Sequence, residues 1–350
     1  MQSRRWLTGF MATGDAAVPR HGRALGALLA VAMPIVVIIA LSSGPADVGV
    51  GDVASVLRAH ANLGPQVDGT TDAIVWDMRL PRVVLALVTG AALSLAGVAF
   101  QTLLRNPLAD PFIIGVSSGA SLAASLALAF GTSALVPPAG FIGGLITVYV
   151  VYQLALEGGE VSVRTMLLAG VVVSSFLSSC TTLLLIIMGR DMHKVVFWLM
   201  GSLEPTGTTV GLLPIVVLAT ALGGLVLMAM ARDLNLLLLG EDHARHLGCD
   251  VPRTKTVCFV CASLLAGVVV SVTGLIGFVG LVVPHMVRLI AGPDNRILLP
   301  HSAVLGGIFL VLADLVARTV ISPEQIPVGT ITGFVGGPFF LYLLVRSRRI

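Results

Sequence analysis

Long stretches of the sequence contain no charged side chain. The longest covers residues 111–156, and others lie between residues 82 and 105 and between residues 164 and 190. Charged residues make up 11% of the chain, whereas soluble domains carry about 25%, so there is too little charge to cover a water-facing surface. Runs of about 20 apolar residues can cross the hydrocarbon core of a bilayer as α-helices. The sequence therefore predicts an all-α integral membrane protein embedded in a lipid bilayer.

Charges, glycines and prolines divide the apolar sequence into ten expected membrane spans. Residues 110–157 hold two spans, because the segment GTSALVPPAG interrupts them. The run 256–287 is longer than one span and shorter than two, so its second helix, the eighth in the chain, is expected to be short. The spans are expected at residues 24–41, 82–105, 110–157 (two), 164–190, 204–232, 256–287 (two), 298–320 and 326–345.

The distribution of basic residues predicts the orientation. With two crossings in residues 256–287, fifteen of the 21 Lys and Arg residues share a side with both termini. The other six are Arg58, Arg79, Arg82, Arg190, Lys194 and Arg318. A single crossing would divide the basic residues almost evenly. Because cytoplasmic loops are enriched in Lys and Arg, we expect ten spans with both termini cytoplasmic.

The chain is expected to consist of a cytoplasmic segment, residues 1–23, and a ten-helix domain, residues 24–350. The apolar run 24–41 has 18 residues, more than the roughly 7–15 of a signal-peptide core, so a retained helix is expected. The outside loop 42–82 contains GVGDVASVLRAHA, which is expected to form a short surface helix.

Several motifs are interpreted as packing rather than chemistry. Cys258 and Cys261 form a C-x-x-C pair inside an apolar run with no His or acid, and metal sites need more than two ligands. The basic residues are scattered, which predicts no nucleic-acid surface. Glycines at four-residue spacing suit close helix packing in lipid. They are Gly115 and Gly119, Gly140 and Gly144, and Gly329, Gly333 and Gly337.

Neither an ion-coupling site nor a nucleotide site is evident. Asp314 and Arg318 lie four positions apart towards one end of the ninth span, whereas ion-driven transporters place ionisable groups near the bilayer midplane. A phosphate loop needs a Gly-Lys pair, and neither Lys194 nor Lys255 follows a glycine. If the chain moves a solute uphill, its energy must come from another polypeptide, and the chain itself is not expected to be an enzyme.

The loop of residues 232–255 gathers charges in an otherwise apolar chain. Asn235 is expected to N-cap a short helix of leucines, and Gly240 is expected to end that helix. Glu241 and Asp242 then suit the start of a second short helix, with Gly248 beyond its end. Two short helices with exposed leucines predict a surface that another protein contacts. An ordinary interhelical loop is the alternative interpretation.

Three long segments carry a family resemblance. Residues 79–121, 277–300 (GFVGLVVPHMVRLIAGPDNRILLP) and 313–340 resemble the permease subunits of bacterial ABC importers for iron chelates and cobalamin, the FecCD-type family. The resemblance implies type II importer architecture, with a homodimer of ten-helix subunits in the inner membrane. It also implies two ATP-binding subunits, which carry ATP and Mg, and a periplasmic substrate-binding protein. No cofactor is expected on this chain.

The resemblance also implies roles for individual residues. Arg79, Arg82 and Arg318 would dock the binding protein, with anchoring of helix ends as the alternative. Hydroxyl residues of the fifth span would line the translocation pathway, with interhelical packing as the alternative: Ser174, Ser175, Ser178, Ser179, Thr181 and Thr182. Cytoplasmic gates would involve Asn106, Leu108, Ser162 and Arg164. The ATPase-coupling positions would be Asn235, Leu236, Leu239, Gly240, Glu241, Ala244, Arg245 and Gly248.

The expected function is import of an iron chelate, either haem or a ferric siderophore. Cobalamin is the alternative within the family. An ion-coupled secondary transporter and a membrane-embedded enzyme are the alternatives from other classes. Each would require ionisable residues clustered in the spans, and no such cluster is evident in the sequence.

Overall fold

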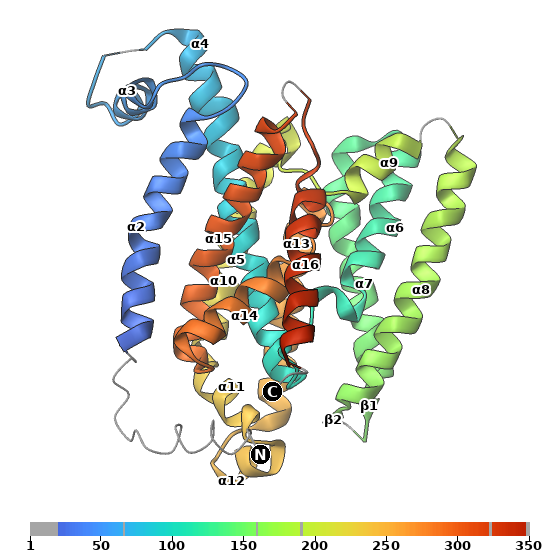
Figure 1. The fold of residues 1–350 in the computed structure, drawn as a ribbon. Coiled ribbons are helices and arrows are strands. Elements are labelled where there is room, and N and C mark those ends of the chain that lie inside the picture. The colour runs from blue at the N-terminus through green and yellow to red at the C-terminus, as the bar shows by residue number, and fades with distance from the viewer. Residues whose placement is uncertain (1–19, 66, 159, 190–191, 322–323, 348–350) are drawn as a thin grey trace.

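The computed structural model describes residues 20–65, 67–158, 160–189, 192–321 and 324–347, and it forms a bundle of roughly aligned helices (Figure 1). Within these residues, seven helices are long and apolar enough to cross a membrane. They are α2 (Arg20–Ser42), α5 (Leu80–Leu103), α7 (Val136–Leu154), α8 (Val163–Met188), α10 (Gly207–Ala229), α13 (Val251–Thr273) and α15 (Asn295–Thr319). Three further apolar helices are α6 (Val116–Ala129), α14 (Val279–Ala291) and α16 (Val328–Ser347). These ten helices lie in the ten segments that were predicted as spans, and seven of them have the length of a full span.

The ambiguous run 256–287 does form two helices, and the second is short as predicted. Helix α14 has 13 residues, which is about 20 Å of helix against roughly 30 Å of hydrocarbon. The turn between α13 and α14 places Gly274 at φ 72° and Phe278 at φ 68°. This left-handed backbone ends α13 abruptly and lets α14 start inside the bundle.

Helix α5 is the centre of the bundle. It packs against α10, α13, α14 and α15, and most of its side chains are buried. Two glycines bring its backbone close to its neighbours, because Gly90 faces the carbonyl group of Gly306 on α15 and Gly97 faces that of Gly280 on α14. Such close approach supplies much of the packing energy between helices in lipid, where apolar burial drives association weakly.

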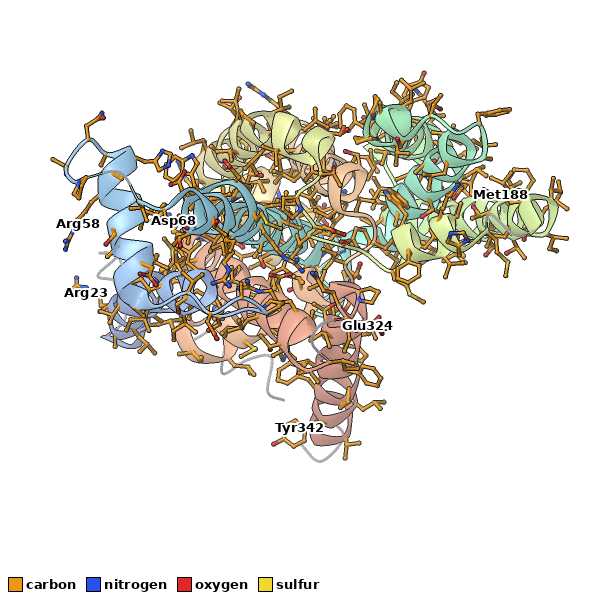
Figure 2. The ribbon with its side chains drawn as sticks, turned by 90° about the horizontal axis from the view of Figure 1, so that it is seen from above. Arg23, Arg58, Asp68, Met188, Glu324 and Tyr342 are labelled. Carbon is orange, nitrogen blue, oxygen red and sulfur yellow. The ribbon has the colours of Figure 1, made fainter. Side chains whose placement is uncertain are left out.

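A second group of helices lies beside this centre. Helices α6 and α7 pack tightly on each other, because the backbone of α6 at Gly119 approaches Thr147 and the carbonyl group of Gly143 on α7. Helix α7 also contacts α13, whereas α8 contacts mainly α6, α7 and a short 3-10 helix, η2 (Pro111–Ile114). Seen from above, α8 ending at Met188 and α16 carrying Tyr342 project from the bundle in different directions (Figure 2).

The predicted surface helix is present as α3 (Val50–His60), at the end of the bundle that is uppermost in Figure 1. We call this end the α3 end. The His60 ring stacks on Trp76 with centroids 3.8 Å apart, and its Nε2 lies 2.8 Å from an Asp72 carboxylate oxygen. These contacts hold α3 against the segment that leads into α5.

The start of the second span differs from the prediction. Helix α4 (Gly69–Asp72) and a π-helix, η1 (Ala73–Arg79), run without a break into α5. The Asp68 carboxylate accepts hydrogen bonds from the N–H groups of Thr70 and Thr71, so the helix starts there. Arg79 and Arg82 therefore lie inside a continuous helix. The prediction placed them at the helix end because it set the boundary by charge and did not consider this cap.

The remaining elements are short. A 3-10 turn, η3 (Ser133–Leu135), separates α6 from α7, and a two-stranded antiparallel hairpin, β1 (Leu156–Glu157) and β2 (Glu160–Val161), precedes α8. Helix α9 (Met192–Leu199) follows α8 and was not predicted. Helices α11 (Ala231–Leu238) and α12 (Glu241–His246) form the charged loop at the opposite end of the bundle, which we call the α12 end (Figure 1).

We expect Gly97→Ala to destabilise the bundle, because the added Cβ would overlap the Gly280 carbonyl oxygen. Overpacking of this kind costs about 1–3 kcal/mol. The measurement is thermal unfolding of the purified protein in detergent. Gly211→Ala on α10 is the matched control, since no atom lies within 4 Å of its added Cβ. Equal unfolding temperatures for both variants would contradict this account of the packing.

Candidate functional site

A buried cluster of charges joins α5 to α15 at the α3 end. The Arg82 Nε atom donates to both carboxylate oxygens of Asp314, at 2.9 and 3.0 Å, and its Nη1 donates to the Gln325 side-chain oxygen at 2.7 Å. The Arg318 Nε atom lies 3.5 Å from Asp314, and its Nη2 donates to the Ala40 carbonyl group of α2. Asp314 thus balances two guanidinium groups in a site that water barely reaches.

Arg79 completes the attachment of α2. Its guanidinium donates to the carbonyl groups of Leu41 at 2.7 Å, Ser42 at 2.9 Å and Ala46 at 2.7 Å. The last carbonyl groups of a helix have no partner within the helix, and a cation also suits the negative end of the helix dipole. Arg79 and Arg318 therefore hold the end of α2 against the bundle.

The structure does not present these three arginines for docking. Their exposed fractions are 6% for Arg79, 9% for Arg82 and 4% for Arg318, and each has hydrogen-bond partners inside the chain. Burial favours the alternative interpretation, in which the arginines anchor helix ends, and their docking role stays a prediction. Sequence reasoning missed this burial, because the partner Asp314 lies 232 positions from Arg82.

The hydroxyl cluster of α8 is split between two environments. Ser175, Ser178, Ser179 and Thr182 are exposed, Ser174 is half-buried beside Gly115, and Thr181 is buried. Three of the hydroxyl groups donate to carbonyl groups four residues earlier in α8, at 2.9–3.0 Å: those of Ser179, Thr181 and Thr182. These bonds satisfy donors that would otherwise face an apolar environment. The exposed members form a small, mildly polar face on α8.

The two predicted gate segments lie at the α12 end. In the segment after α5, the Asn106 side-chain oxygen accepts the Leu108 N–H at 3.0 Å and forms a compact turn. Asp110 accepts the Phe112 N–H at 2.8 Å. Burial raises the pKa of the Asp110 carboxyl group to about 6, and the Phe112 hydrogen bond opposes this shift.

The second segment caps α8. The Ser162 hydroxyl accepts the Thr165 N–H and lies 3.1 Å from the Thr165 hydroxyl, which in turn donates to Glu157. Arg164, in the first turn of α8, is exposed. The gate role of either segment stays a prediction.

The predicted two-helix form of the charged loop is confirmed, with one correction. Gly240, at φ 107°, separates α11 from α12, and Gly248, at φ 83°, follows α12. Asn235 does not cap a helix, because it lies inside α11. Its side chain instead donates to Asp294 at 2.6 Å and accepts from the Asn295 backbone at 2.8 Å, which ties α11 to the start of α15.

The leucines of the loop divide by burial. Leu234 and Leu237 are buried, Leu236 and Leu239 are half-buried, and Leu238 is exposed together with Leu247. Among the other predicted coupling positions, Ala244 is buried and Arg245 and Gly248 are exposed. The outward surface of the loop thus combines two exposed leucines with charged and histidine side chains. We call this surface, which includes Leu238 and Leu247, the loop surface.

Glu241 faces inward and bridges two basic residues that sequence reasoning did not assign to the site. One carboxylate oxygen lies 3.3 Å from the Arg105 guanidinium, and the other lies 2.7 Å from the Lys255 ammonium group. A polar cavity of about 330 Å³ adjoins the pair and is also lined by Glu157 and Ser162. The ion pairs and the cavity bring the charged loop close to Ser162 of one gate segment and to Arg105, which directly precedes the other.

Comparison with known proteins identifies the family. The sequence model of the FecCD transport family matches residues 32–346. The chain belongs to the FecCD transport family. This chain is 42% identical over 334 residues to the cobalamin import system permease protein BtuC of Halobacterium salinarum, covering 93% of this chain and 89% of the relative.

Two further comparisons agree with this assignment. The hemin transport system permease protein HmuU of Yersinia pestis is 38% identical over 293 residues, covering 80% of this chain and 86% of the relative. A solved structure of a metal-chelate type ABC transporter in an inward-facing conformation superposes with a TM-score of 0.79 at 31% identity, covering 93% of this chain and 99% of that chain. The FecCD chain described here is thus a multi-pass membrane protein with an ABC permease fold.

We expect Asp314→Asn to destabilise the protein, because it leaves Arg82 and Arg318 buried without a counter-charge. Removing one partner of a buried ion pair costs about 3–5 kcal/mol. The measurement is thermal unfolding in detergent, with the exposed acid Glu204 changed to Gln as the control. An Asp314→Asn protein that unfolds like the parent and loses only affinity for a partner protein would restore the docking interpretation.

Proposed function

We propose that this chain is the permease subunit of an ATP-driven ABC importer that carries a bulky metal chelate across the inner membrane. The observation that carries the proposal is the family match, which spans residues 32–346. The superposition with a metal-chelate type ABC transporter supports the same conclusion, because it covers 93% of this chain.

The energy for transport would come from two ATP-binding subunits at the α12 end. The sequence contains no phosphate loop, since neither lysine follows a glycine. The loop surface, with Leu238 and Leu247 exposed beside charged side chains, suits a protein partner, since exposed apolar side chains rimmed by polar groups are typical of interfaces. ATP and Mg would be bound by these partner subunits.

A second copy of the chain would complete the pathway. Helix α8 is barely covered by the rest of the chain and projects from the bundle, as does α16 (Figure 2). On α16, a Cβ added at Gly333 or Gly337 would meet no atom of the described residues within 4 Å, which leaves space beside these glycines. Small residues on membrane helices permit close contact with another helix. In a homodimer, α8 and α16 of the two copies would therefore enclose a central pathway.

The exposed hydroxyl face of α8 suits a wall of that pathway. Ser175, Ser178 and Thr182 offer mildly polar surface without charge, between apolar side chains such as Phe176 and Leu183. A bulky amphipathic solute could slide past such a wall without binding tightly. Alternating access would then depend on the gate segments at the α12 end.

A periplasmic binding protein would deliver the solute to the α3 end. The docking role predicted for Arg79, Arg82 and Arg318 is kept as part of this proposal, and exposed groups at that end would add further contacts. Glu204 is one such group, beside a cavity of about 440 Å³ whose lining includes Arg82 and Thr206.

The solute class is proposed from the relatives. Their names include permeases for cobalamin, hemin and siderophores. Cobalamin and hemin are metal chelates, and a siderophore becomes one when it binds iron. We retain an iron chelate, haem or a ferric siderophore, as the leading expectation and cobalamin as the alternative. The cluster of Arg82, Asp314 and Arg318 does not suit ion coupling, because it is internally paired at the α3 end and not near the middle.

The test is reconstitution of the chain in proteoliposomes with its ATP-binding subunits and binding protein. We expect ATP-dependent accumulation of one chelate among haem, a ferric siderophore and cyanocobalamin, offered in separate arms. A Ser178→Trp variant should abolish uptake by filling the pathway, whereas Leu225→Trp, on the exposed face of α10, should not. Accumulation by the chain alone under an ion gradient, without ATP-binding subunits, would contradict the proposed function.

We expect Leu238→Asp combined with Leu247→Asp to weaken the association with the ATP-binding subunits at least about tenfold, since desolvated apolar contacts dominate protein interfaces. Folding should be unaffected, because both side chains are exposed. Affinity is measured by titration of the purified permease with the ATP-binding subunit. Leu63→Asp is the control, since Leu63 is 79% exposed in the α3–α4 loop. Unchanged affinity in the double variant would move the partner interface away from the loop surface.

A further inference from the structure

Arg105 ends α5 in a backbone conformation that glycine adopts more readily. Its φ is 47°, and within the described residues only Asn62 and Phe278 share a positive φ among non-glycine residues. The Asn106 N–H donates to the Gln101 carbonyl group at 3.0 Å, and the Arg105 N–H donates to that of Thr102 at 3.1 Å. This is the arrangement in which helices usually end on glycine. Holding an arginine in this conformation costs conformational free energy. This cost suggests that the Arg105 side chain has a role.

The Arg105 side chain reaches across to the charged loop. Its Nη2 lies 3.3 Å from Glu241, the first residue of α12, and the other Glu241 oxygen lies 2.7 Å from Lys255 on α13. The Lys255 side chain is 12% exposed and held by the bundle, whereas that of Arg105 is 48% exposed. The Glu241 carboxylate therefore joins a fixed group on α13 to an accessible group on the segment that follows α5.

The segment beyond Arg105 is stiff. The Asn106 side chain accepts the Leu108 N–H at 3.0 Å, and the Asn106 carbonyl group accepts the Ala109 N–H at 3.1 Å. A displacement of Arg105 would therefore carry the turn of Asn106 and Leu108 with it. The polar cavity of about 330 Å³ beside the pair leaves room for such a displacement.

We propose that the Arg105–Glu241 ion pair is the linkage through which movement of α12 reaches the gate segment after α5, with Lys255 orienting the Glu241 carboxylate. This proposal rests on the proposed function. Arg105, Glu241 and Lys255 are positioning residues in it, since they would transmit motion without touching the solute.

The exposure of the pair supports a moving part. Ion pairs that water reaches contribute little to stability, so they break and re-form at small cost. The side chains of Arg105 and Glu241 are 48% and 27% exposed, whereas those of Arg82 and Asp314 at the α3 end are 11% and 2% exposed. The buried pair suits a permanent joint between helices, and the exposed pair suits a contact that changes during a transport cycle.

The test is Arg105→Gly in the complete importer, reconstituted with ATP-binding subunits and binding protein. Glycine fits the backbone at φ 47°, so the thermal unfolding temperature should be unchanged or higher. The solute transported per ATP hydrolysed should fall at least about fivefold, a common size for coupling between sites, while the ATP-binding subunits stay associated. Asn62→Gly is the matched control, because it makes the same backbone change at φ 58° in the α3–α4 loop.

The double variant separates the linkage from other roles of Glu241. Glu241→Gln should lower the transport ratio as Arg105→Gly does, and the combined variant should lose no more than the more severe single variant, because both changes break one contact. Additive losses, or an unchanged ratio in Arg105→Gly, would overturn the linkage. Those results would leave the proposed function intact as long as the parent importer shows ATP-dependent uptake, whereas a parent without such uptake would contradict the proposed function itself.

Discussion

In a bilayer, water cannot satisfy the polar groups of the chain, and the structure depends on that constraint. Each spanning helix satisfies its own backbone, and because apolar side chains gain little by leaving lipid, helices associate through close backbone contact. Gly90 and Gly97 provide this contact on α5, against Gly306 and Gly280. The central helix is thereby fixed among α10, α13, α14 and α15, with a buried charged cluster at one end and the predicted gate segment after its other end.

The two charged clusters at the ends of α5 differ in burial, and the difference implies different tasks. Arg82, Asp314 and Arg318 are enclosed by helices and hydrogen-bonded to the chain, so separating them would expose unpaired charge to an apolar site. Arg105 and Glu241 lie in contact with water and with a polar cavity, so their separation costs little. One end of the bundle is thus built to stay together, and the opposite end is suited to move.

The surfaces that this chain leaves uncovered indicate a protein that functions as part of a larger assembly. Helices α8 and α16 project from the bundle with little cover (Figure 2), and the loop surface exposes Leu238 and Leu247. Membership of the FecCD transport family agrees with this view, because the relatives named above are permease proteins of import or transport systems. The translocation pathway, ATP hydrolysis and solute delivery would then be carried out by different chains.

Local composition was enough to predict much of the fold. The ten helices, the short α14, the surface helix α3 and the two short helices separated at Gly240 all follow from runs of apolar residues and from glycines that stop helices, which are properties of neighbouring residues. The cap at Asp68 starts the helix before the predicted boundary, and this cap is also a local feature of the sequence. The positions of Arg79 and Arg82 in the bundle, in contrast, depend on distant segments. Those arginines were expected at a surface, and only the folded chain shows them buried against α2 and Asp314. Arg82 and Asp314 are 232 positions apart, and Arg105 and Glu241 are 136 apart. The sequence alone determined which segments cross the membrane, whereas tertiary structure decided which charges meet, because a partner so distant along the chain is selected by helix packing and leaves no local pattern.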